Sequence, residues 1–293
     1  MTPYHRLLLR ALVFAAIMAA LPYDAAADNP RDAELAALGH QARLWTELDR
    51  PERALASYTA LLQRAPQDSA AWLARARLFA RQGEHASAAA DFERALALDA
   101  SDAEAWYQLS LARYELGQRA AAIEALEAAL QRAPAHAAAW GQLGVLQLQA
   151  RAFDAAIESL DTALKLDPHD GDALRNRGSA WLHKRDFARA VADLDAAIRL
   201  NPQDATAHGN RGIAFTRQAE FTRAIADFDA ALQLQPDNAV LHFNRGVAFE
   251  ARGDWAPALA SYDAALRLQP GLTPAQQRRD AAVRQLHQRK RAG

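Results

Sequence analysis

Five carboxamide side chains that recur every 34 residues are the residues of this chain best suited to bind another molecule. A carboxamide offers two N–H donors and one acceptor oxygen, so it can pair with a peptide backbone without reading the side chains of that peptide. Because the spacing is constant, each carboxamide occupies the same place in a repeated structural unit. We name these residues the amide row: Gln108, Gln142, Asn176, Asn210 and Asn244.

Larger side chains flank the amide row. Tyr107 and Phe243 each precede one of its members directly, and we add them to the candidate peptide-binding site. Three residues after four of the carboxamides stand the aliphatic residues Leu111, Val145, Ile213 and Val247. Exposed apolar patches usually mark interfaces, so this pattern favours a partner with hydrophobic side chains. An equally open alternative is that the aliphatic residues pack against the neighbouring unit.

The amide row is not sufficient for tight binding by itself. Five hydrogen bonds at roughly 1 kcal/mol each give about 5 kcal/mol, whereas micromolar affinity needs about 8 kcal/mol. Selectivity would therefore come from neighbouring residues. A second interpretation, in which the carboxamides are only solvated, stays open at this point.

Residues for catalysis do not come together in this sequence. The 9 histidines are scattered, and His208 and His242 stand a full 34-residue unit apart. Neighbouring helix pairs are about 10 Å apart, while one zinc ion needs ligand bonds of about 2 Å. The sequence has no phosphate-binding glycine loop, no nucleophile elbow and no H-E-x-x-H motif. We therefore predict no enzyme activity, no catalytic residue, no metal site and no cofactor.

The elements that must position the amide row follow from the same period. Proline or its replacement Ala100 forms one column, and alanine forms another twelve residues earlier, from Ala54 to Ala258 without exception. A fixed period of this length indicates stacked helical hairpins. The proline column consists of Pro66, Ala100, Pro134, Pro168, Pro202, Pro236 and Pro270.

The packing of each hairpin can be predicted once the proline column is numbered as position 32 of its unit. Positions 4, 8 and 11 share one face of a first helix, with large residues on both sides of a small one such as Gly178. Positions 17, 20, 24 and 27 repeat this scheme on a second helix. Gly83, Gly117 and Gly253 are expected to end the first helix of their units.

These residues resemble the tetratricopeptide repeat. One unit carries the motif as Trp140, Leu143, Gly144, Phe153, Ala156, Ala163 and Pro168. The resemblance implies an all-α, right-handed superhelical α-solenoid whose first helices line a concave groove. It also makes the amide row similar to the asparagine ladder of O-GlcNAc transferases, whose catalytic half is missing here. The seven expected units span residues 35–68, 69–102, 103–136, 137–170, 171–204, 205–238 and 239–272.

Some positions depart from the repeat pattern or allow two roles. Arg113 and Gln147 replace aromatic residues at position 11, which predicts a locally thinner core. Position 7 holds Arg177, Arg211 and Arg245, on the side of the helix that packs. We expect ion pairs with acids at position 23, namely Asp193 and Asp227, rather than contact with a ligand.

The two ends of the chain differ from the repeats. Residues 1–27 have the three parts of a signal peptide: Arg6 and Arg10, an apolar run at 11–21, and a small-residue site at 25–27. We therefore expect a cleaved chain that is periplasmic or secreted, with a retained anchor as the alternative. Residues 28–34 form an N-terminal segment. Residues 273–293 are predicted to form a capping helix with a basic tail.

Charge narrows the range of partners. The chain has 34 basic and 35 acidic residues, and the stretch between the signal peptide and the tail carries about −7, which repels nucleic acid. The tail could touch an anionic membrane surface or an acidic partner, or could simply be solvated. We predict a scaffold that binds a protein or peptide partner in a cell-envelope assembly process. The alternative is a structural oligomer that forms by self-association.

Overall fold

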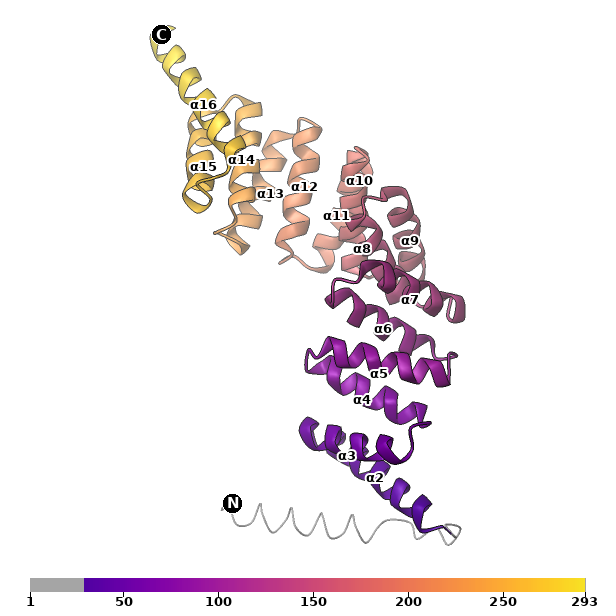
Figure 1. Cartoon of the computed structure of the whole chain (residues 1–293). Coiled ribbons are helices and arrows are strands. Elements are labelled where there is room, and N and C mark those ends of the chain that lie inside the picture. The colour runs from indigo at the N-terminus through magenta and orange to yellow at the C-terminus, as the bar shows by residue number, and fades with distance from the viewer. Residues whose placement is uncertain (1–28, 293) are drawn as a thin grey trace, which may run out of the picture. The chain divides into compact units, whose positions relative to one another are not determined.

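The computed structural model describes residues 29–292, and every regular element in that part of the chain is an α-helix (Figure 1). The described helices divide between two compact units, the first ending at Ala100 and the second beginning at Ser101. Within each unit consecutive helices pack in pairs, with the most extensive contacts inside a pair. The signal-peptide prediction for residues 1–27 lies outside the described residues.

The first unit contains two helical hairpins. In each hairpin a first helix packs on the second helix that follows it, and α3 also contacts α4. Their cores consist mainly of alanine and leucine, together with Tyr58 in the first hairpin and Phe92 in the second. The helices are α2 (Pro30–Glu47), α3 (Pro51–Arg64), α4 (Ser69–Arg81) and α5 (His85–Leu98).

The second unit contains five hairpins and a last single helix, α16, which packs on α15. Each hairpin corresponds to one 34-residue repeat of the sequence. The helices are α6 (Ala103–Glu115), α7 (Arg119–Arg132), α8 (Ala137–Gln149), α9 (Phe153–Leu166), α10 (Gly171–His183), α11 (Phe187–Leu200), α12 (Ala205–Arg217), α13 (Phe221–Leu234), α14 (Ala239–Arg252), α15 (Trp255–Leu268) and α16 (Thr273–Ala292).

Close approach of the paired helices depends on the small residue at position 8. A Cβ atom added to Gly178 would lie 2.8 Å from Cγ of Leu194 on the second helix, and one added to Gly246 would lie 2.6 Å from the ring of Tyr262. These distances are well inside van der Waals contact, so a larger residue would push the helices apart. The predicted packing of small against large residues is thus confirmed.

The turn inside each hairpin contains a residue in the left-handed backbone region at position 15. Gly83, Gly117 and Gly253 have φ of 76°, 73° and 92°, as expected for residues that end a helix. The other hairpins place residues with a Cβ there, which strains the backbone. These residues are Asp49, Arg151, Arg185 and Ala219.

The connections between hairpins are fixed by polar contacts. Asp170 and Asp204 accept a hydrogen bond from a backbone N–H in the first turn of the following helix, as N-cap residues do. Trp140 donates its indole N–H to the carbonyl oxygen of Pro134, six residues earlier, at 2.9 Å. Among the described residues, no helix combines the length and the apolar character needed to cross a membrane.

The all-helical prediction, with paired helices repeated along the chain, is therefore confirmed. The helix predicted from Thr273 onward is also present. Its buried residues Ala275 and Ala282 face the preceding hairpin, while most of its other described side chains remain exposed or half-exposed.

Candidate functional site

The amide row lies on the first helices of five successive hairpins, α6, α8, α10, α12 and α14, at the sixth position of each unit. All five side chains are partly exposed. Helix α10 contacts both α8 and α12, and α12 contacts α14, so four members stand on neighbouring helices that touch. The four helices that carry the row from Gln142 to Asn244 follow one another along the second unit (Figure 1).

The members of the amide row differ in their hydrogen bonds. Gln108 donates from Nε2 to Oε1 of Glu104, one helical turn earlier on α6, at 2.7 Å. Within residues 29–292 the carboxamides of Gln142, Asn176, Asn210 and Asn244 form no hydrogen bond with the protein. These four side chains therefore keep all their donors and acceptors for water or a ligand.

Tyr107 contributes to the packing of the array as well as to its surface. Its ring lies 4.7 Å from the ring of His136, between centroids, and contacts the core beneath α8. Burial, followed by the nearby negative charge of Glu104, raises the pKa of Tyr107 above its ordinary value. His136 itself accepts a hydrogen bond from the backbone N–H of Ala139 at 3.3 Å.

Phe243 has a similar double role at the other end of the row. Its ring lies 6.0 Å from the ring of the buried Tyr262, and its own side chain is partly exposed. Tyr262 donates its hydroxyl to Glu250 at 2.5 Å, and burial followed by this hydrogen bond raises the pKa of Tyr262 above its ordinary value. Both flanking aromatic residues thus expose only part of their rings.

The aliphatic residues three positions after the carboxamides are also partly buried. Ile213 packs against the core formed around Phe215 and Phe228, yet part of its side chain remains accessible. Val145 and Val247 have the same intermediate exposure. The packing interpretation is therefore confirmed for Ile213, and contact of these residues with a partner stays a prediction.

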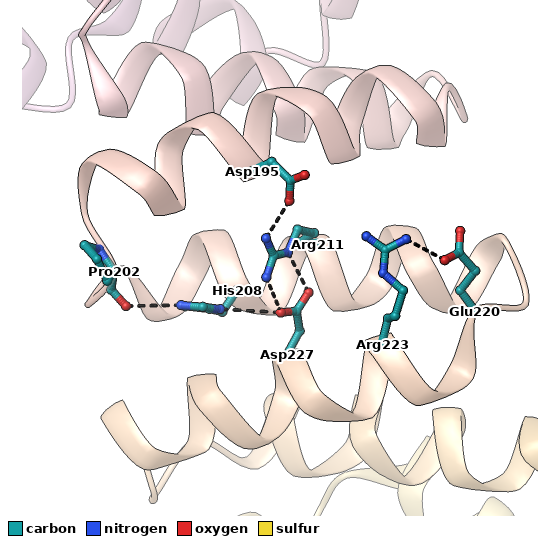
Figure 2. A network of polar contacts seen from close by, with 7 residues as sticks. All are labelled: Asp195, Pro202, His208, Arg211, Glu220, Arg223 and Asp227. Atoms are coloured by element: carbon teal, nitrogen blue, oxygen red, sulfur yellow. Dashed lines mark hydrogen bonds and ion pairs between the residues drawn. The ribbon is translucent and has the colours of Figure 1, made fainter.

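The arginines at position 7 are positioned quite differently from the carboxamides that precede them. Arg211 donates from Nε and Nη2 to both carboxylate oxygens of Asp227, at 2.8 and 2.6 Å (Figure 2). Its Nη1 donates to Asp195 at 2.5 Å. Asp227 belongs to the same hairpin and Asp195 to the preceding one, so one guanidinium bridges two hairpins.

The same bridge recurs along the array. Arg177 donates to Asp193 at 2.7 and 2.6 Å and to Asp161 of the preceding hairpin at 2.6 Å. Hydrogen bonds to Asp193 and Asp227, followed by the charges of these acids, raise the pKa of Arg177 and of Arg211. The predicted pairing with position 23 is confirmed. The second acid, at position 25 of the preceding unit, is a contact that the sequence prediction missed.

Two hairpins of the second unit lack this bridge. Position 7 holds the buried Leu109 in α6 and Leu143 in α8. In these hairpins the polar residue stands one turn later, at position 11: Gln147 accepts a hydrogen bond from Ser159 at 2.7 Å, and Arg113 donates to the backbone oxygen of Ala121 at 3.1 Å. The polar and the large apolar residues have exchanged places.

His208 and His242 replace tryptophan at position 4. Each ring donates from Nε2 to the oxygen of a proline six residues earlier. His208 donates to Pro202 at 3.1 Å (Figure 2), and His242 donates to Pro236 at 2.9 Å. These contacts give the histidines a structural role. In the described part of the chain no three residues among His, Cys, Asp and Glu are grouped to hold a metal ion.

The basic residues of α16 are partly used by the fold. Arg279 stands at position 7 of what would be an eighth unit and donates to Asp263 at 2.6 Å, as the bridging arginines do. Arg278 donates to Glu250 at 2.9 Å. These two arginines are therefore less available to an anionic surface than their sequence positions suggest.

Comparisons with known proteins agree with this geometry. The solved structures similar to the chain include YrrB, described as a TPR protein with an unusual peptide-binding site (21% identity, 64% of this chain and 97% of that chain, TM-score 0.57). They also include pilF of Pseudomonas aeruginosa (20% identity, 73% of this chain and 97% of that chain, TM-score 0.63). A third is a tetratricopeptide repeat protein of Parabacteroides merdae (16% identity, 86% of this chain and 99% of that chain, TM-score 0.61).

At these identities the likeness to solved structures shows the fold alone. No curated protein matches the chain. The family model of the tetratricopeptide repeat matches residues 41–103, 107–170, 142–205, 184–239 and 210–273, which together make up most of the sequence. The chain therefore belongs to the tetratricopeptide repeat family.

Proposed function

We propose that this chain is a non-enzymatic scaffold that holds an extended segment of a partner protein along the amide row. Tetratricopeptide repeat proteins are generally scaffolds for protein–protein interaction, and the fold supports this general role here. The observation that carries the finer proposal is a set of four partly exposed carboxamides that have no hydrogen-bond partner among residues 29–292. They stand on four helices, each of which contacts the next.

The energetics require more than the carboxamides. Four hydrogen bonds contribute about 4 kcal/mol at roughly 1 kcal/mol each. The partly exposed Val145, Ile213 and Val247 beside them can bury apolar surface, which stabilises a complex by about 25 cal/mol per Å². A segment that uses both kinds of contact can reach a binding free energy of about 8 kcal/mol, which corresponds to micromolar affinity.

A cell-envelope setting is part of the same proposal. The first 27 residues have the pattern of a signal peptide. One solved structure of similar fold is described by its peptide-binding site, and another is pilF. N-terminal sequencing of the protein recovered from a periplasmic fraction is expected to begin at Asp28. A chain that retains residues 1–27 in the cytoplasm would remove the envelope from the proposal.

Site-specific crosslinking tests the amide row directly. A photoreactive amino acid at position 210 of the full chain is expected to attach to a partner, whereas the same probe at Gln233, exposed on α13, is expected to attach to none. The attachment should be lost in a variant that also carries Asn176→Ala and Asn244→Ala. Equal attachment from both positions would contradict binding at the row.

Self-association is the second candidate, and one observation favours it. Four second helices of the second unit end in leucines at position 30 that remain 39–45% exposed: Leu166, Leu200, Leu234 and Leu268. Rows of exposed apolar residues often mark contacts between proteins. Light scattering at low and high salt separates the possibilities, because apolar association persists in salt while pairing of a basic tail with an acidic body weakens. A monomer in both conditions excludes this candidate.

A further inference from the structure

We infer that the segment bound along the amide row is a polyproline II helix that advances one turn per hairpin and offers an aliphatic side chain at every third residue. This inference rests on the proposed function and specifies the partner of the same site. It follows from the repeat geometry of the four free carboxamides and of the aliphatic residues beside them.

The spacing of the row selects the conformation of the occupant. Helices α8, α10, α12 and α14 touch in order, and packed helices have axes about 8–10 Å apart. A polyproline II helix rises about 3.1 Å per residue with three residues per turn, hence about 9 Å per turn. One turn of this helix therefore matches one hairpin, and each hairpin meets the same face of the occupant.

Other regular conformations do not offer the same contacts. Three residues of a β-strand also span about 10 Å, but residues i and i+3 point to opposite faces because side chains alternate. An α-helix repeats its face after seven residues, about 10.5 Å, but its backbone N–H and C=O groups are paired within the helix and leave none for the carboxamides. Only the three-residue helix presents both its unpaired backbone groups and one repeated side chain to every carboxamide.

The residues beside the carboxamides specify the repeated side chain. Val145, Ile213 and Val247 stand three residues after Gln142, Asn210 and Asn244, on the same face of their helices and partly exposed. They favour an aliphatic residue at the matching place of each turn. Ser179 takes this position after Asn176, so the turn opposite α10 has no apolar contact to make.

The charges around the row favour an uncharged occupant. Arg175 directly precedes Asn176, and its Nη1 lies 2.7 Å from Asp172 and 3.0 Å from Asp204. Its charge is therefore already balanced by two carboxylates. The bridging arginines Arg177 and Arg211 are likewise paired inside the array. Proline and aliphatic residues fit a surface whose nearest cations are neutralised in this way.

Two twelve-residue peptides of identical composition test the register. The first is (Leu-Pro-Pro)₄, with leucine at every third position; the second has its four leucines at positions 3, 5, 7 and 9 and proline elsewhere. Fluorescence anisotropy of the labelled peptides with the full chain measures both affinities. We expect the first peptide to bind at least tenfold more tightly. Ser179→Val should strengthen its binding several-fold, by adding the missing apolar contact.

A variant without three of the carboxamides separates the claim that the amide row binds a peptide from the claim that the peptide has a three-residue register. Asn176→Ala, Asn210→Ala and Asn244→Ala together should weaken the first peptide at least tenfold. The matched control replaces three exposed glutamines at position 29 of second helices, Gln63, Gln131 and Gln233, with alanine, and should bind as the native chain does.

Equal affinity for the two peptides, with both lost in the asparagine variant, would overturn the three-residue register and leave the proposed function standing. Failure of both peptides to bind the native chain, or binding that the asparagine variant retains, would overturn the register and the role of the row together. Circular dichroism of each variant shows whether the helices remain folded.

Discussion

Neighbouring residues on the same helices have opposite roles in this protein. Asn210 and Arg211 are adjacent in α12, yet the guanidinium binds two carboxylates and the carboxamide binds none. The same contrast holds for Asn176 and Arg177 in α10. One position along the helix rotates a side chain by about 100°, from the packed side to the accessible side.

The difference shows how to read polar residues in a repeat array. A polar side chain at the packed side needs partners, because an unpaired charge is costly to bury. Asp227, which is 4% exposed, supplies such a partner to Arg211. A polar side chain on the accessible side needs none. The proposed function assigns the recurring carboxamides without internal partners to a ligand rather than to the fold.

A second contrast separates the hairpins themselves. From α10 onward an arginine at position 7 ties each hairpin to the preceding one, and α9–α10, α11–α12 and α13–α14 contact each other extensively. Between α7 and α8, where Leu143 replaces the arginine, the contact is less extensive. The bridge thus accompanies the closest junctions of the second unit.

Arg211→Leu should have the largest effect on this comparison. It leaves the buried carboxylate of Asp227 without its main partner, and breaking a buried pair costs about 3 kcal/mol or more. Urea unfolding followed by circular dichroism measures the change. Arg217→Leu, an exposed site on the same helix, is the control and should change stability by less than about 0.5 kcal/mol.

A second substitution then reverses the first. Arg211→Leu combined with Asp227→Ala reproduces the Leu109 and Ala125 pair of the hairpin α6–α7, in which both residues are buried. Most of the lost stability should return. If Arg211→Leu alone is as stable as the native chain, the bridge contributes nothing to stability.

Leu143→Arg tests whether the arginine bridge can be introduced into a hairpin that lacks it. The change removes a buried leucine and adds a charge beside Ser159, so we expect a loss of about 2 kcal/mol. Adding Ser159→Asp should recover at least about 1 kcal/mol, because Glu127 already occupies position 25 and completes the bridge. If the double variant is no more stable than the single one, the bridge does not transfer between hairpins.

The helix pattern was readable from the sequence because packing repeats with the same 34-residue period. Small residues at position 8 and left-handed glycines at position 15 follow from local rules. The pairing of Arg177 with Asp193 could be predicted on a helical wheel. Its bond to Asp161 could not, since a wheel of one hairpin omits the neighbour. The clue was present as a spacing of 16 residues in both directions.

Within the candidate site, the row and one of its internal hydrogen bonds could be predicted from the sequence, whereas two further contacts could not. The pairing of Gln108 with Glu104 had a signal, a spacing of four residues on one helix. Tyr107 lies on α6 and His136 directly precedes α8, so their contact depends on how two consecutive hairpins stack. The hydrogen bond from Ser159 to Gln147 likewise joins two packed helices, so it could not be read from the sequence alone.

Ala219→Gly offers a smaller effect that depends on the backbone alone. Ala219 has φ of 61° in the turn between α12 and α13. Glycine adopts this conformation without strain, so stability should rise by about 0.5–1 kcal/mol. The reverse change at the equivalent turn, Gly253→Ala, should lower stability by a similar amount. Thermal unfolding of both variants provides a scale for the bridge variants.

The smallest effect on stability is expected for the carboxamides. Asn176→Ala, Asn210→Ala and Asn244→Ala together remove no hydrogen bond within the described protein, so the free energy of unfolding should stay within about 0.5 kcal/mol of the native value. Urea unfolding checks this. A loss comparable to that of Arg211→Leu would mean that the carboxamides serve the fold, and the contrast between positions 6 and 7 would disappear.

Nuclear magnetic resonance of the side-chain NH₂ groups tests the central claim most directly. In the full chain labelled at asparagine and titrated with (Leu-Pro-Pro)₄, the signals of Asn176, Asn210 and Asn244 should shift together with one affinity. Those of Asn201 and Asn238, which serve the connections between hairpins, should stay in place. Shifts at Asn201 and Asn238 with none along the amide row would contradict the account.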